Sequence, residues 1–192
     1  MGTTTIGVRH YSLICVLSAL SCGYFLRLIT MKVKVFLYLE RKFSKMKVLF
    51  VCTGNTCRSP MAEGIFREIL KKDGNEDIMC QSAGLTAING DPAAENAVEV
   101  CREIGVDISD HEARRFTAEE IGVWDTYFTM SKTHAYILEQ GGVPVEKIYV
   151  PSYIEDPFGR ETEVYRKCRD KIIEEINEFY AKLKVHMANS VI

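Results

Sequence analysis

Apolar and polar residues follow two alternating patterns from Met46 onward. Short, mostly apolar runs predict strands buried in a sheet, at 47–51, 77–84, 124–130 and 147–151. Other stretches carry apolar residues at three- and four-residue steps, which predicts helices. These helices are expected from Pro60, over 93–104, over 132–140 and from Val164 to Leu183. Strands that alternate with helices predict a doubly wound α/β domain, with a parallel sheet covered on both faces.

Residues 1–45 differ from the rest of the chain. No charge occurs from residue 11 to residue 26, and basic residues lie on both sides of this run. The run is typical of a signal-peptide core or of a marginal membrane anchor through residues 11–30, because a full span needs roughly 20 apolar residues. We favour a third interpretation, a start at Met46, because the first strand follows Met46 without a linker. The expected division is an apolar extension followed by one domain at 46–192.

Composition narrows the class of protein. Hydrophobic residues make up 47% and charged residues 26% of the 192, which is typical of one soluble globular domain. The formal net charge of -2 offers no basic surface for nucleic acid. The seven cysteines and four histidines are dispersed, so we expect no metal and no cofactor. Unpaired, scattered thiols favour a cytoplasmic protein, with membrane association only if residues 1–45 are part of it.

The stretch VLFVCTGNTCRSPMAEG, residues 48–64, concentrates reactive and hydrogen-bonding side chains. Its loop, residues 52–59, joins the carboxyl end of the first predicted strand to the helix at Pro60, where open α/β sheets bind ligands. The N–H groups of such a loop and helix start attract anions, and Gly54 is expected to let the chain curl around one. Arg58 supplies two parallel donors for phosphate oxygens. The 52–59 loop therefore predicts a phosphate site.

Cys52 lies at the base of this predicted site. The field that attracts phosphate also favours a thiolate, so we expect an ionised sulfur placed for in-line attack on phosphorus. Ser59 is expected to hydrogen-bond the sulfur and to cap the helix, and Asn55 to brace the loop. The alternative is a small buried hydrophobic residue, the commonest role of a free cysteine. The strand before and helix after C-x5-R favour phosphoryl transfer through a cysteinyl-phosphate.

The motif VCTGNTCRSPMAEG resembles the active-site loop of the low-molecular-weight protein tyrosine phosphatase family, whose fold is flavodoxin-like with a four-stranded parallel sheet. The resemblance spans about residues 46–185, because SAG (82–84) and DPFG (156–159) also match that family. It implies that Cys52 is the nucleophile, Arg58 the phosphate clamp and Asp156 the general acid. It also implies that the phosphate is bound or the loop supported by Thr53, Gly54, Asn55, Thr56, Cys57 and Ser59.

The resemblance also bears on oxidation and on substrate. The family is known for a redox pair at positions matching Cys52 and Cys57, which would shield the nucleophile from irreversible oxidation; the alternative is a merely tolerated second thiol. Thr56 stands where tyrosine phosphatases of the family usually carry isoleucine, and together with DPFG it resembles the bacterial protein-arginine phosphatase branch. We expect Thr56 and Phe158 to shape a pocket for the guanidinium of phosphoarginine in proteins.

Three alternatives stay open at this point. The first is a phosphotyrosine protein phosphatase in which Thr56 is neutral drift. The second is an arsenate reductase, which needs further cysteines, usually after the third strand, whereas residues 128–138 contain none. The third is a catalytically silent phosphate-binding module, which would be expected to lack Cys52 or Asp156.

Overall fold

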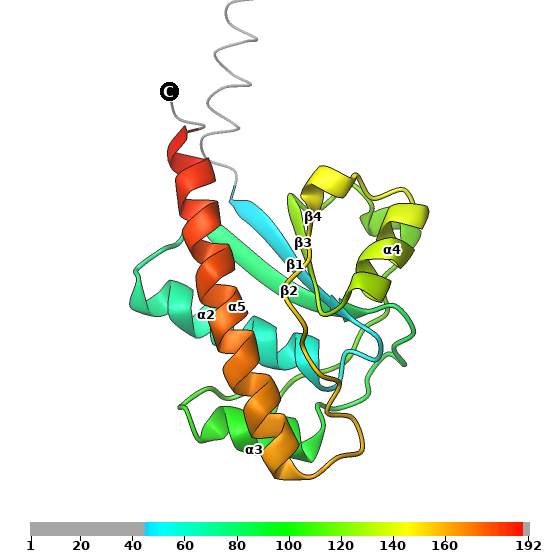
Figure 1. Ribbon diagram of the computed structural model, residues 1–192, viewed down its shortest axis with the longest axis vertical. Helices are drawn as coiled ribbons and strands as arrows, with labels where there is room; N and C mark the ends of the chain where they lie inside the picture. Colours follow the sequence, from blue (N-terminus) through cyan, green and yellow to red (C-terminus); the bar gives the residue numbers. More distant parts are fainter. Residues whose placement is uncertain (1–44, 190–192) are drawn as a thin grey trace, which may run out of the picture. The chain divides into compact units, whose positions relative to one another are not determined.

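The computed structural model describes residues 45–189 and confirms the predicted flavodoxin-like α/β architecture (Figure 1). Four parallel strands form one sheet in the order β2-β1-β3-β4. The strands are β1 (Met46–Cys52), β2 (Ile78–Gly84), β3 (Thr126–Thr129) and β4 (Ile148–Tyr149). The chain adds strands on one side of β1 and then on the other, so the carboxyl end of β1 lies at the switch point of the sheet.

Helices cover both faces of this sheet. They are α2 (Arg58–Lys72), α3 (Glu95–Arg102), α4 (Lys132–Gln140) and α5 (Thr162–Asn189), with short 3-10 turns η1 (Ala118–Glu120) and η2 (Val145–Lys147). In Figure 1, α2, α3 and α5 lie on one side of the sheet and α4 lies on the other. Within residues 45–189 no helix is both long and apolar enough to cross a membrane.

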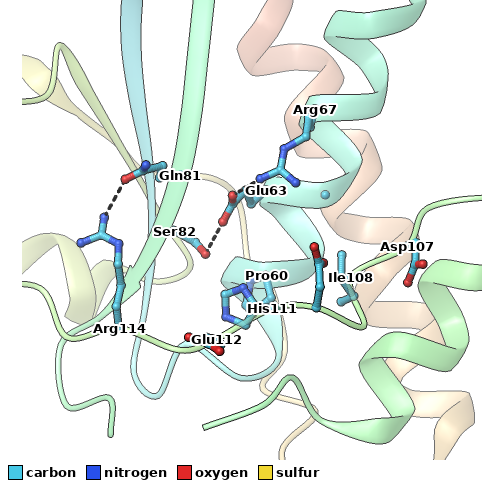
Figure 2. A pocket seen from close by; sticks show the side chains of 12 residues that line it. Pro60, Glu63, Arg67, Gln81, Ser82, Asp107, Ile108, His111, Glu112 and Arg114 are labelled. Atoms are coloured by element: carbon cyan, nitrogen blue, oxygen red, sulfur yellow. Dashed lines mark hydrogen bonds and ion pairs between the residues drawn. The ribbon is translucent and has the colours of Figure 1, made fainter. Parts of the chain in front are cut away.

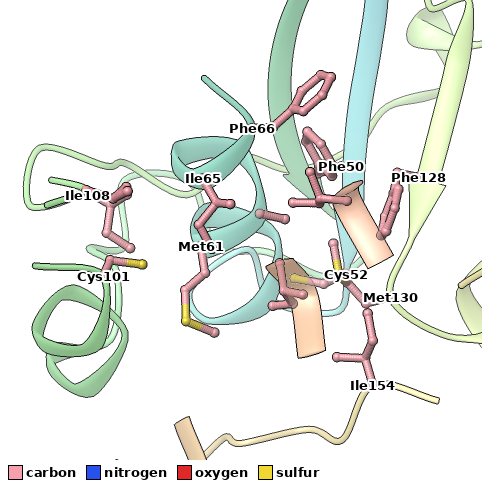
Figure 3. Packing of buried hydrophobic residues seen from close by; sticks show 14 of the residues in the cluster. Phe50, Cys52, Met61, Ile65, Phe66, Cys101, Ile108, Phe128, Met130 and Ile154 are labelled. Carbon is pink, nitrogen blue, oxygen red and sulfur yellow. The ribbon is translucent and has the colours of Figure 1, made fainter. Parts of the chain in front are cut away.

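The central strand β1 is buried on both sides. Val48 and Phe50 face the three-helix side, and Leu49 and Val51 pack with residues of the α4 side; all four are fully buried. Figure 3 shows Phe50 between aromatic side chains of α2 and β3, and its ring centroid lies 5.6 Å from that of Phe66. This two-sided burial explains why the β1 sequence is continuously apolar instead of alternating.

Several predicted boundaries were wrong. Trp124 is buried but precedes β3, where its indole Nε1 donates to Glu120 Oε1 over 3.2 Å. The last strand has two residues, because η2 occupies 145–147. Helix α3 ends at Arg102 and leaves Ile104 36% exposed, since Gly105 turns the chain with a φ of 76°. The division at residue 45 stays a prediction, because residues 1–44 lie outside the described range.

Gly84, the last residue of β2, brings the sheet and the 52–59 loop together. A Cβ on Gly84 would lie 2.7 Å from the Thr53 carbonyl oxygen and 2.8 Å from the Asn55 nitrogen. Both contacts are with backbone atoms, which cannot move aside without displacing the loop. Glycine is therefore required in the SAG turn because the loop backbone packs directly against it.

Candidate active site

A cavity of 200 Å³ opens at the carboxyl end of β1. It is lined by Cys52, Thr53, Gly54, Thr56, Cys57, Arg58, Asp156 and Phe158. The structure thus brings the predicted site residues together from the 52–59 loop and from the segment before α5. The remaining two, Asn55 and Ser59, belong to the same loop and are fully buried.

Asn55 gives the loop its curvature. Its φ of 57° makes it the one residue other than glycine with a positive φ among those described. Gly54, which was expected to let the chain curl around an anion, does not have a positive φ, and a Cβ there would meet only Thr56 Oγ1, at 3.7 Å. Asparagine tolerates the left-handed conformation and makes this turn, and the role expected of Gly54 stays a prediction.

The sulfur of Cys52 is surrounded by hydrogen-bond donors. The backbone N–H of Asn55 donates to Cys52 Sγ over 3.2 Å, and Ser59 Oγ lies 2.9 Å from the same sulfur. Ser59 Oγ also accepts from Asn55 Nδ2 over 2.9 Å, which leaves its hydroxyl hydrogen for the sulfur. The expected helix cap by Ser59 was wrong: α2 begins at Arg58, and Ser59 lies inside its first turn with its side chain on Cys52.

A buried polar network holds Asn55 from behind. Its Nδ2 donates to Ser82 Oγ over 2.9 Å, and Ser82 Oγ donates to Glu63 Oε2 over 2.6 Å. The Asn55 amide oxygen accepts from the Arg114 backbone N–H, and the Asn55 carbonyl oxygen bonds His111 Nε2, each over 2.8 Å. Figure 2 shows the partners Ser82, Glu63, His111 and Arg114 around a second cavity, of 270 Å³, whose lining does not include Cys52.

The contacts of His111 and Arg114 with Asn55 were not predicted from the sequence. No local pattern identifies them, because they reach the loop across more than fifty residues of sequence. Both residues hydrogen-bond Asn55, the loop residue with a positive φ, from outside the C-x5-R motif. A preorganised loop of this kind presents its donors without reorganisation when a ligand binds.

Arg58 and Asp156 form an ion pair at this cavity. The side chain of Arg58 is 7% exposed, whereas that of Asp156 is 50% exposed. Asp156 Oδ1 also accepts from the Phe158 backbone N–H over 3.2 Å, which shapes the DPFG turn. Because the guanidinium is buried and the carboxyl is half exposed, a phosphoryl group can replace the carboxyl as the partner of Arg58.

Two further side chains join the cavity to distant helices. Thr53 Oγ1 lies 2.9 Å from Nε2 of His134, a buried residue in the first turn of α4. Cys57 Sγ lies 3.3 Å from the hydroxyl of Tyr165 on α5, and burial raises the pKa of the Cys57 thiol. Cys52 and Cys57 are both free thiols here.

Strand β1 ends in a cysteine, and the loop after it closes with an arginine at the start of a helix. This arrangement is typical of cysteine-dependent phosphatases. Comparison with known proteins specifies the family. Residues 47–189 match the family model described as low molecular weight phosphotyrosine protein phosphatase. The chain belongs to this family and is a phosphatase.

Individual relatives agree on the fold and differ in activity. A protein-arginine-phosphatase of Bacillus subtilis (strain 168) is 32% identical, and the match covers 72% of this chain and 97% of the relative. A solved low molecular weight protein tyrosine phosphatase from T. tengcongensis is 40% identical, with a TM-score of 0.67, and the match covers 72% of this chain and 99% of that one. An arsenate reductase of Staphylococcus saprophyticus is 31% identical over 71% of this chain and 97% of its own.

Proposed function

We propose that this phosphatase removes phosphate from phosphoarginine in proteins, with phosphotyrosine as the alternative substrate. The observation that carries the proposal is the lining of the 200 Å³ cavity, where Thr56 and Phe158 accompany Cys52, Arg58 and Asp156. Thr56 lines the cavity with a hydroxyl-bearing side chain, whose Oγ1 lies 3.6 Å from Cys57 Sγ, where an aliphatic side chain would favour a phenyl ring. Relatives named as protein-arginine-phosphatases support the same substrate.

The contacts of Cys52 support its role as nucleophile. In the first step its sulfur attacks phosphorus, the P–N bond breaks, and Asp156 gives its proton to the leaving guanidine nitrogen. In the second step water attacks phosphorus, its proton passes to the Asp156 carboxylate, and the S–P bond breaks. The hydrogen bonds from Asn55 and Ser59 stabilise the sulfur as it leaves.

Arg58 is the proposed partner of the phosphoryl group and also pairs with Asp156. Its guanidinium binds phosphoryl oxygens in a two-pronged manner and stabilises the charge of the transition state. In the structure the same guanidinium pairs with Asp156. A phosphoryl group that replaces this carboxyl at Arg58 leaves Asp156 beside the leaving group, where the general acid is needed.

The other thiols argue against the arsenate reductase alternative. Transfer of oxidation needs a thiolate that can reach the nucleophile. Burial raises the pKa of Cys80, Cys101 and Cys168 to about 12, so these thiols stay protonated at neutral pH. Among the described residues, Cys57 is the one thiol besides Cys52 that lines the cavity. Reversible inactivation by oxidation of this pair remains a prediction.

Substrate preference is tested by replacing Thr56 in the full chain. Thr56→Ile is expected to lower kcat/KM on phosphoarginine protein by about tenfold or more, and to lower it less or raise it on phosphotyrosine protein, because one pocket contact is worth roughly 1–3 kcal/mol. Thr133→Ile, the same change on the exposed surface of α4, serves as the matched control. A wild-type enzyme that prefers phosphotyrosine and is unchanged by Thr56→Ile would exclude phosphoarginine as the substrate.

A further inference from the structure

His134 has both ring nitrogens engaged beside the active site. It is 5% exposed, in the first turn of α4. Its Nε2 lies 2.9 Å from Thr53 Oγ1, and its Nδ1 lies 2.9 Å from Ser131 Oγ. Thr53 follows Cys52 directly and lines the same cavity. The contact therefore runs from a helix cap on the α4 side of the sheet to the wall of the active site.

The ring of His134 is neutral over the physiological range. Burial lowers the pKa of His134 to about 4; the positive charge of Arg58 acts in the same direction, and Asp156 opposes it. A neutral imidazole has one N–H donor and one acceptor nitrogen. The chain of hydrogen bonds from Ser131 through His134 to Thr53 must therefore run in one direction only.

Ser131 determines that direction. Its Oγ already accepts from the backbone N–H of His134 over 3.2 Å, as the cap of α4. If Oγ also accepted from the ring, its own hydroxyl hydrogen would have no partner among residues 45–189. If the hydroxyl instead donates to Nδ1, Nε2 carries the hydrogen and donates to Thr53 Oγ1. In this second arrangement the hydroxyl hydrogen without a partner among residues 45–189 belongs to Thr53, which is exposed, whereas in the first it belongs to Ser131, which is only partly exposed.

The hydrogen of the Thr53 hydroxyl is then left for the cavity. We propose that His134 is a positioning residue that turns this hydroxyl toward bound phosphate, and that Thr53 donates to a phosphoryl oxygen beside Arg58. The inference rests on the proposed function only in placing phosphate in this cavity, and it is the same for phosphoarginine and phosphotyrosine. It adds a side-chain donor to the backbone donors of the 52–59 loop.

Two measurements on the full chain test the inference without turnover. The first is the tautomer of His134, read from the ring nitrogen NMR signals between pH 5 and pH 8. We expect hydrogen on Nε2 throughout this range, whereas hydrogen on Nδ1 would overturn the proposed direction. The second is the affinity for inorganic phosphate, measured by titration calorimetry on the wild type and on variants.

Removal of the hydroxyl in Thr53→Val is expected to weaken phosphate binding about tenfold, as for a lost hydrogen bond to a charged group. Thr53→Ser keeps a hydroxyl and should bind at least threefold more tightly than Thr53→Val. His134→Phe should cost about threefold, and the double variant His134→Phe with Thr53→Val should bind no more weakly than Thr53→Val alone, because both changes act through one hydroxyl. Thr133→Val is the exposed control.

The outcomes separate the two proposals. Unchanged binding in Thr53→Val, or losses that multiply in the double variant, would overturn the role of Thr53 and His134. A wild type that binds phosphate normally but ignores phosphoarginine would overturn the proposed substrate alone. A wild type without phosphate binding at this cavity would overturn both.

Discussion

The sulfur of Cys52 receives two hydrogen bonds, one from the loop backbone and one from Ser59. Both donors are fixed by Asn55, whose own contacts lie outside the C-x5-R motif. The free energy that orders the loop is therefore supplied by folding instead of by substrate binding. Such preorganised donors are worth more than donors that must reorient when charge develops.

Cys52→Ser separates binding from chemistry. A serine hydroxyl is a far weaker nucleophile at neutral pH, and Arg58 with the loop N–H groups is left in place. We expect turnover to fall by about 10³-fold or more, while inorganic phosphate binds within about threefold of the wild type. Steady-state kinetics and calorimetry measure the two quantities.

A cysteine outside the cavity provides the control for this change. Cys80 is half-buried in β2, and Cys80→Ser is expected to leave turnover within about twofold, because no step of the reaction needs it. An active Cys52→Ser enzyme would contradict covalent catalysis through this residue.

At this scale the sequence predicted the residues that touch the cavity but not those that hold them. Cys52, Arg58 and Asp156 share a cavity as expected from the motif and the family resemblance. The left-handed turn falls on Asn55 and not on Gly54, because contacts from Ser82 and Arg114 compensate its strain. These contacts depend on strand register and chain crossing, which no local pattern encodes.

The segment between β4 and α5 carries Asp156 and is anchored at its start. Ile154 is 3% exposed and packs in the same cluster as Met130, as Figure 3 shows. Ser152 donates from its backbone and its hydroxyl to Glu175, a buried carboxylate of α5 that also pairs with Lys171. The segment that carries the candidate general acid is thus held at its start by the packing of Ile154 and by the hydrogen bonds from Ser152 to Glu175.

Glu175→Gln tests this anchor. The change keeps the volume but removes the charge that Lys171 and Ser152 bind, so we expect unfolding free energy to fall by about 1–2 kcal/mol. We also expect kcat/KM to fall severalfold as Asp156 loses its position. Chemical denaturation and kinetics measure both. Glu174→Gln, an exposed neighbour that also pairs with Lys171, is the matched control.

The pH dependence of this effect has a definite sign. Burial alone would raise the pKa of Glu175, but hydrogen bonds from Ser152 and Lys171 outweigh it and hold the pKa below its usual 4.5. A lowered folded pKa stabilises the protein above pH 4.5, and this contribution is lost as the pH falls through the folded value. The difference between wild type and Glu175→Gln should therefore be largest above pH 4.5 and shrink below it. A constant difference would contradict the ionised anchor.

The elements were predicted better than their ends. Continuous apolar runs and the stripe of α5 identified the sheet and its helices, since both patterns reflect burial of whole faces. The strand expected at 147–151 has two residues because η2 precedes it and the acid segment leaves the sheet early. Such boundaries depend on turns and caps, where tertiary contacts outweigh local preference.

At the scale of the whole molecule, the described residues 45–189 pack hydrophobic clusters on both sides of β1. This strand pairs with β2 on one side and β3 on the other, and its first residue donates a backbone hydrogen bond to Asp77 over 2.7 Å. The family match begins at residue 47, one residue into β1. The central strand thus begins at Met46 and the family match one residue later. The candidate nucleophile, Cys52, is the last residue of the same strand.

A protein that starts at Met46 is therefore expected to fold and work as the full chain does. Its denaturant midpoint should be unchanged and its kcat/KM on phosphorylated protein should lie within about twofold, because no described contact of the core or cavity is removed. A start at Phe50 is the control: it deletes Val48 and Leu49, both fully buried in the central strand, and should yield no folded protein. A large loss of stability or activity in the Met46 protein would show that residues 1–45 belong to the working domain, and would contradict the division expected from sequence.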